Sequence, residues 1–185
     1  TLNLNSGSIT ANCAIDYGNT GSTGEGFGGG VFAANSTTVN LGGTIISGNW
    51  ASKSQVGYGG GICMETAITY TSALNMTSGT ISGNIASQTE EGNGGGLYLK
   101  GNITATMSGG TISGDTASSD SIGYGGAFFI GENAKVTSDS STVNVSSNYA
   151  TRNSGSQGYG GAFYLSLIHI SEPTRLLRSS LMPSS

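Results

Sequence analysis

The sequence predicts an all-β protein folded as a parallel β-helix, or solenoid, of about four to five turns with three short strands per turn. Three observations support this fold class. Glycine supplies 33 of 185 residues and charged residues only 9%, a composition unlike that of helical or α/β enzymes. Apolar residues alternate with polar or small ones in short blocks between Gly and Ser, which is strand patterning. The blocks recur at nearly constant spacing, so stacked repeats would pair like with like.

The first block of each repeat alternates apolar and polar residues and predicts the first strand. It is found at residues 2–4, 39–41, 74–76 and 105–107. In the last repeat, residues 143–145 merge this pattern with that of the second block, and the sequence leaves their register open.

The second block places Asn or Asp three residues after Ile or Val. These side chains tolerate unusual backbone angles and can bond to stacked equivalents, so we expect a turn with a hydrogen-bonded ladder. Asp115 is expected to accept bonds from Asn84 and Asn148. The five ladder residues are Asn12, Asn49, Asn84, Asp115 and Asn148.

An alanine stands two residues after each ladder residue and predicts a tight corner with room for one methyl group. The five are Ala14, Ala51, Ala86, Ala117 and Ala150. Variable stretches such as residues 52–57 and 87–92 follow this corner, and we expect them to be loops on one edge of the coil.

The third block opens with two glycines, and its copies start at residues 28, 59, 94, 125 and 160, that is 31, 35, 31 and 35 residues apart. We expect one parity to face the core, namely Val31, Ile62, Leu97, Phe128 and Phe163. The other parity would form an outer aromatic column of Phe32, Tyr98, Phe129 and Tyr164, with Cys63 in the second turn. Such an apolar stripe marks either a binding surface or a face that a loop covers.

The last 21 residues differ from the rest in composition. They contain both prolines and the only histidine, His169, but no glycine. Residues 165–175 resemble the in-frame translation of a transposase-type DNA sequencing adapter, and residues 182–185 fit its far end. We therefore interpret residues 1–164 as a fragment of a β-helix domain, uncapped at both ends, and residues 165–185 as a non-native tail without function.

The repeats of residues 1–164 resemble those of a known family. The Gly-Gly-Ala-Phe runs at 125–128 and 160–163, with the second blocks, are similar to the G-G-A-[ILV] and F-x-x-N repeats of polymorphic outer-membrane proteins. This sequence departs from that pattern in having Ile or Val for Phe, and Gly at three of the five Ala positions. The resemblance implies a right-handed parallel β-helix and a bacterial adhesin-like stalk or passenger, secreted or at the cell surface.

The expected function is non-enzymatic adhesion or surface recognition, with a host-cell surface, a glycan or a matrix protein as partner and with self-association through the open ends. Six Lys and Arg residues and a net charge of −4 disfavour nucleic acid, and no apolar run is long enough to span a bilayer. No catalytic, cofactor or metal residue is assigned. No histidine precedes the tail, and Cys13 and Cys63 stand in different columns, where two thiols make no metal site.

Two alternatives remain open. A polysaccharide-active lyase or hydrolase would need clustered acidic and basic side chains, and we expect Lys53, Lys100, Lys135 and Arg152 to share no column with acidic partners. An ice- or glycan-binding row of hydroxyl groups would be interrupted by Ile45 and Asn144. Its members would be Ser8, Thr10, Thr80, Ser82, Thr111 and Ser113.

Overall fold

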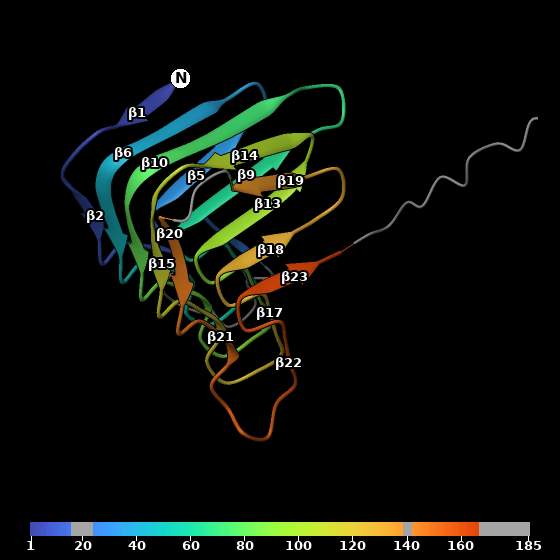
Figure 1. The fold of residues 1–185 in the computed structure, drawn as a ribbon. Helices are drawn as coiled ribbons and strands as arrows, with labels where there is room; N and C mark the ends of the chain where they lie inside the picture. The colour runs from blue at the N-terminus through green and yellow to red at the C-terminus, as the bar shows by residue number, and fades with distance from the viewer. Residues whose placement is uncertain (16–23, 139–141, 167–185) are drawn as a thin grey trace, which may run out of the picture.

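The chain forms an all-β parallel solenoid of about five turns. The structure, a computed structural model, describes residues 1–15, 24–138 and 142–166. Each strand pairs in parallel with its counterpart in the next turn, so the turns stack along one axis (Figure 1). None of the described residues forms a helix that could cross a membrane.

The stacked strands make four sheets, A to D in chain order. Sheet A has eight strands: β1 (Leu2–Leu4), β2 (Ser8–Thr10), β6 (Thr38–Ser47), β10 (Ser72–Ser82), β14 (Ile103–Met107), β15 (Gly110–Ser113), β19 (Lys135–Ser138) and β20 (Val143–Ser146). Sheet B has five: β3 (Cys13–Ile15), β7 (Trp50–Ser52), β11 (Ile85–Ser87), β16 (Thr116–Ser118) and β21 (Tyr149–Thr151).

The other two sheets bring the chain back to the start of the next turn. Sheet C has five two-residue strands: β4 (Gly26–Phe27), β8 (Gly57–Tyr58), β12 (Gly92–Asn93), β17 (Gly123–Tyr124) and β22 (Gly158–Tyr159). Sheet D, the Gly-Gly block, has β5 (Val31–Ala34), β9 (Ile62–Thr66), β13 (Leu97–Gly101), β18 (Phe128–Ile130) and β23 (Phe163–Leu165).

Each turn therefore has more strands than the three expected. Sheets B and C supply the additional ones, and their strands of two or three residues are too short to show an alternating pattern. In the second and third turns, the first two blocks join into the single long strands β6 and β10.

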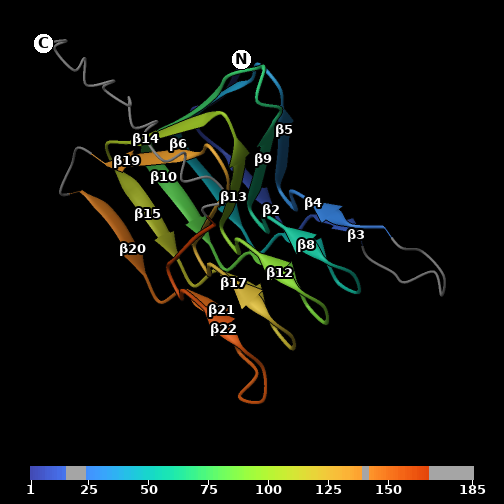
Figure 2. The ribbon, with the colours of Figure 1, turned by 90° about the vertical axis from the view of Figure 1, so that its right-hand side faces the viewer.

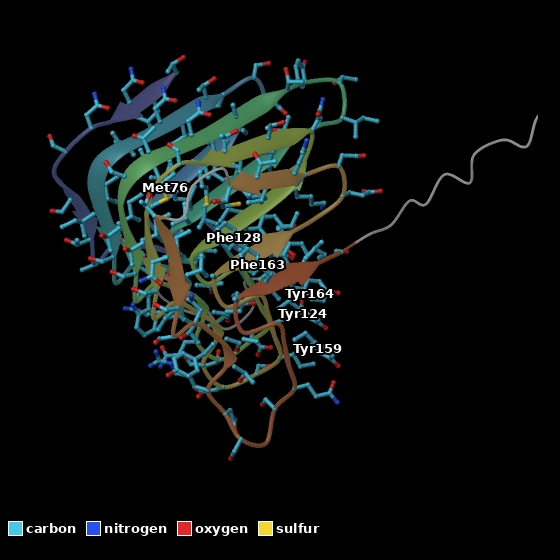
Figure 3. All side chains as sticks on the ribbon, in the orientation of Figure 1. Met76, Tyr124, Phe128, Tyr159, Phe163 and Tyr164 are labelled. Atoms are coloured by element: carbon cyan, nitrogen blue, oxygen red, sulfur yellow. The ribbon has the colours of Figure 1, made fainter. Side chains whose placement is uncertain are left out.

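The apolar core lies between sheets A and D. Ile81 and Leu74 of sheet A and Leu97 and Phe128 of sheet D are all fully buried, which confirms the expected inward parity. Phe163 has the same parity and stacks on Phe128 with ring centroids 4.8 Å apart, but it is 44% exposed because it belongs to the last turn (Figure 3).

The solenoid narrows where sheets B and C face each other (Figure 1). The five alanines stand in register here, since the residues on either side of them pair, as in Trp50 with Ile85 and Ser52 with Ser87. A Cβ atom on Gly92 of sheet C would overlap the carbonyl oxygen of Ala117. The alanines thus occupy the middle of strands rather than the corner we expected, and they are small because the facing backbone comes so close.

The last repeat has a defined register. Val143–Ser146 pair with Gly110–Ser113, so residues 143–145 belong to the second block, while Lys135–Ser138 supply the first.

The loops between sheets B and C leave the solenoid on one edge, as expected (Figure 2). Stacked buried serines form hydrogen bonds to the backbone of these loops. The Ser87 hydroxyl donates to the carbonyl of Gln55 at 2.8 Å and accepts the backbone N–H of Glu90 at 3.1 Å. Ser118 does the same for the next loop, with the carbonyl of Glu90 and the N–H of Ser121.

Candidate functional site

The Asn/Asp ladder lies inside the solenoid and stabilises the stacking of the turns. The side-chain oxygen of Asn84 accepts bonds from the backbone and side-chain nitrogens of Asn49, both at 3.0 Å, and Asn12 donates to Asn49 in the same way. The left-handed backbone conformation expected at the ladder residue falls instead on the residue before it, as at Gly48 and Gly83 with φ of 61° and 62°. The ladder side chains are therefore free to point inward.

Asp115 continues this ladder with one difference from expectation. Its Oδ1 accepts the backbone and side-chain N–H groups of Asn84, both at 2.8 Å, as predicted. Asn148 does not donate to it. The backbone N–H of Asp115 instead donates to Asn148 Oδ1 at 2.9 Å, and the Asn148 amide donates to the carbonyl of Ile112.

The strongest candidate for a functional surface is a chain of eight aromatic rings on the outer face of sheets C and D, which we call the aromatic ladder. The sequence predicted its sheet D members. The sheet C members were missed, although an aromatic residue directly precedes the Gly-Gly block in four of the five repeats. In order of contact, the rings belong to Phe32, Phe27, Tyr58, Tyr98, Phe129, Tyr164, Tyr124 and Tyr159.

Each ring of the aromatic ladder contacts the next, with centroids 4.8–5.9 Å apart, within the range of favourable ring pairs. The chain of contacts crosses from sheet C to sheet D between Tyr58 and Tyr98, at 5.0 Å. It crosses there because the neighbouring positions hold the small side chains of Cys63 and Asn93. Figure 3 shows Tyr164, Tyr124 and Tyr159 along one outer edge, with Phe128 toward the interior.

The exposure of the aromatic ladder varies along its length. Tyr98 is only 4% exposed and Cys63 is fully buried, whereas Phe32 and Tyr159 are 52% and 42% exposed. The predicted outer column of sheet D therefore lies outside the core. Its centre is covered by the rings of sheet C, and not by a loop. The exposed rings lie toward the two ends.

Polar groups border the rings. The hydroxyl of Tyr58 donates to Glu25 Oε1 at 3.2 Å, and the amide of Asn93 donates to Glu91 Oε1 at 3.1 Å. Burial, followed by the Glu25 carboxylate, raises the pKa of Tyr58 to about 12, and burial raises the pKa of Tyr98 as well. These phenols therefore stay neutral hydrogen-bonding groups beside carboxylates.

Three shallow depressions open along the same face, with volumes of about 430, 200 and 180 Å³. Phe32 lines the largest, and Phe129 lines both of the others. Lys100 and Glu132 border the largest and the smallest. Each depression thus combines an aromatic wall with a carboxylate.

The expectation that Lys100 shares no column with an acidic side chain, which counted against a polysaccharide-active enzyme, is wrong. Lys100 stands in register with Glu65, and their side chains form an ion pair at 3.4 Å, with 47% and 40% exposure. The turns bring them together because both follow the outer aromatic position of sheet D. Within the described residues, no three His, Cys, Asp or Glu side chains gather as metal ligands.

The two cysteines lie in different sheets, as predicted, Cys13 in β3 and Cys63 in β9. Burial raises the pKa of the Cys63 thiol, so it is a neutral packed group.

The hydroxyl row on the outer face of sheet A has the expected interruptions, since Ile45 pairs with Ser8 and Thr80, and Asn144 with Thr111. A second row beside it has no interruption and runs through Thr10, Ser47, Ser82, Ser113 and Ser146.

A partly exposed row of asparagines lies on the first-block strands of sheet A. The amide of Asn40 donates to Asn3 Oδ1 at 2.7 Å, and that of Asn75 donates to Asn40 Oδ1 at 2.9 Å.

Comparisons with protein families, with curated proteins and with solved structures each found no match to this chain.

Proposed function

We propose that this chain is a non-enzymatic recognition segment of a secreted or cell-surface bacterial adhesin, and that its aromatic ladder binds glycans. The bacterial origin and the relation to polymorphic outer-membrane proteins rest on the repeat motifs alone. The binding role rests on one observation, the unbroken aromatic ladder with carboxylates along its border.

A sugar ring has an apolar C–H face and a rim of hydroxyl groups, and a site for it needs both a flat apolar wall and hydrogen-bonding groups. Phe32 and Tyr159 offer exposed rings at the two ends of the aromatic ladder. Glu65 and Lys100 next to Phe32 offer an acceptor and a donor. Depressions beside five of the eight rings suit an extended glycan better than a single sugar.

The test is a double variant, Phe32→Ser with Tyr159→Ser, applied to immobilised glycans and host-cell monolayers. Both side chains are about half exposed, so we expect a nearly unchanged melting temperature and at least tenfold weaker binding. Ile45→Ser is the matched control, since Ile45 is 46% exposed on sheet A.

Four outcomes would count against this proposal. Equal binding by the double variant would exclude the aromatic ladder, and no binding by the unaltered chain would exclude the adhesive role. Stronger binding by Ile45→Ser, which would complete the interrupted hydroxyl row, would move the binding surface to sheet A. Shortened glycans after incubation would instead support the enzyme alternative.

A further inference from the structure

Asp115 is the one ladder position with a carboxylate, and its second oxygen has no partner. The residue is fully buried, and Oδ2 has no hydrogen-bond partner among the described residues. Oδ1, in contrast, accepts both bonds from Asn84. The unpartnered oxygen therefore needs an explanation.

The amides of the same ladder show what the missing partner is. In three turns the side-chain nitrogen of the ladder asparagine donates to a backbone carbonyl in the turn before. The acceptor is always the Ile that stands three residues ahead of the ladder residue of that turn. Asn49 donates to Ile9 at 2.9 Å, Asn84 to Ile46 at 3.0 Å and Asn148 to Ile112 at 3.1 Å. The equivalent acceptor for residue 115 is the carbonyl of Ile81.

An ionised Asp115 would put a second acceptor where each amide puts a donor. A buried carboxylate oxygen without a donor is costly, whereas a protonated one can donate to a carbonyl in the manner of an amide. A protonated carboxyl has one O–H where an amide has two N–H donors, so protonation restores one of the two side-chain bonds that Asn49 and Asn84 each donate.

Among the described residues, no charged side chain pairs with the Asp115 carboxylate. It contacts Asn84 from the turn before and Asn148 from the turn after, neither of which titrates. From sheet D, Gly96 packs so closely that a Cβ atom there would lie 3.0 Å from Oδ2. Arg152 is the charged side chain on this flank, and it is exposed, with Nη2 3.5 Å from the carbonyl of Gly114.

We propose that Asp115 is a proton-binding site which tightens the middle turns of the solenoid when protonated and loosens them when ionised. Gly96 stands two residues before Tyr98, so the site lies against the strand that carries the centre of the aromatic ladder. The proposal concerns stability and does not depend on glycan binding.

The pKa of Asp115 agrees with this geometry. Burial raises the pKa of Asp115 from 3.8 to about 7, against the opposing effect of the bonds from Asn84. The folded state therefore holds a proton that the unfolded state has released between about pH 4 and pH 7. Stability is highest below the unfolded pKa and falls as the pH rises through this window, with the unfolding equilibrium constant increasing up to about tenfold per pH unit.

The experiment is urea unfolding of the full chain at pH 5, 6, 7 and 8, with Asp115→Asn as the test variant. We expect Asp115→Asn to flatten the pH dependence and to raise the urea midpoint at pH 8. Asp120→Asn, which removes the same charge from an exposed loop position, should keep the original slope. Parallel profiles for Asp115→Asn and the unaltered chain would overturn the proposal, as would a lower midpoint for Asp115→Asn at pH 8.

A second measurement does not depend on the variant. The carboxyl ¹³C signal of Asp115 in the folded, unaltered chain should titrate near pH 7. Titration near pH 4 would contradict a proton-binding role even if Asp115→Asn failed to fold.

Discussion

At the scale of the residue, the space between facing backbones determines which positions must be glycine. Gly92 faces Ala117 across the narrow edge, and its Cβ would overlap the carbonyl oxygen of that residue. A Cβ atom added to Gly30, in the third position of a Gly-Gly block, would lie 2.8 Å from its nearest atom, the carbonyl oxygen of Gly61. The equivalent positions in the last two turns are Ala127 and Ala162, so the fold can accommodate a methyl group there.

We predict that Gly92→Ala lowers the free energy of unfolding by about 2–3 kcal/mol, because the backbone of the sheet must shift to accept the methyl group. Gly30→Ala is the matched variant and should stay within about 1 kcal/mol of the original. Chemical denaturation measures both. Equal losses of unfolding free energy for the two variants would contradict this. They would show that glycine is required for its backbone freedom in general, and not for the close approach of the backbones at sheet C.

At the scale of the element, the two outer columns of sheets C and D complement each other in size. The second turn has Tyr58 in sheet C and Cys63 in sheet D, and the third has Asn93 and Tyr98, so these two turns each have one ring instead of two. The aromatic ladder remains continuous because Tyr98 contacts both Tyr58 and Phe129. Its centre therefore contributes to stability, and its ends remain exposed.

We predict that Tyr98→Ala lowers stability by about 3–5 kcal/mol, as expected for an aromatic ring removed from a packed site. Phe32→Ala, at the exposed end, should change stability by less than about 1 kcal/mol. Thermal and urea unfolding would distinguish the two variants. A small effect for Tyr98→Ala would mean that the ring contributes little to stability. The aromatic ladder would then be a surface feature along its whole length.

At the scale of the whole molecule, each turn is stabilised by its neighbours. Val39 and Phe128 are fully buried between turns, while their register partners Leu2 and Phe163, in the first and last turns, are 38% and 44% exposed. Within the described residues, β1 of the first turn and β23 of the last turn each pair with one strand only, and such strand edges favour pairing with another chain.

We predict that the 185-residue chain associates end to end, with sedimentation that depends on protein concentration. Phe163→Glu should reduce this association, because the new charge would be buried between stacked copies. Tyr159→Glu serves as its control, since Tyr159 faces outward in the same turn. A concentration-independent monomer of the unaltered chain would contradict the prediction.

The repeated blocks alone were sufficient to predict the parallel solenoid and the inward parity of Val31, Ile62, Leu97 and Phe128. They were also sufficient to predict that the ladder amides are stacked. Such features depend on contacts between equivalent residues of successive turns, and a repeat in sequence records those contacts directly.

The tertiary structure decided which side chains of different sheets lie side by side across the corners of the solenoid. It placed the Tyr58 ring of sheet C against the Tyr98 ring of sheet D, and it left one oxygen of Asp115 without a donor among the described residues. A one-dimensional repeat does not predict these neighbours, because they depend on how sharply each corner turns and how closely the facing backbones approach.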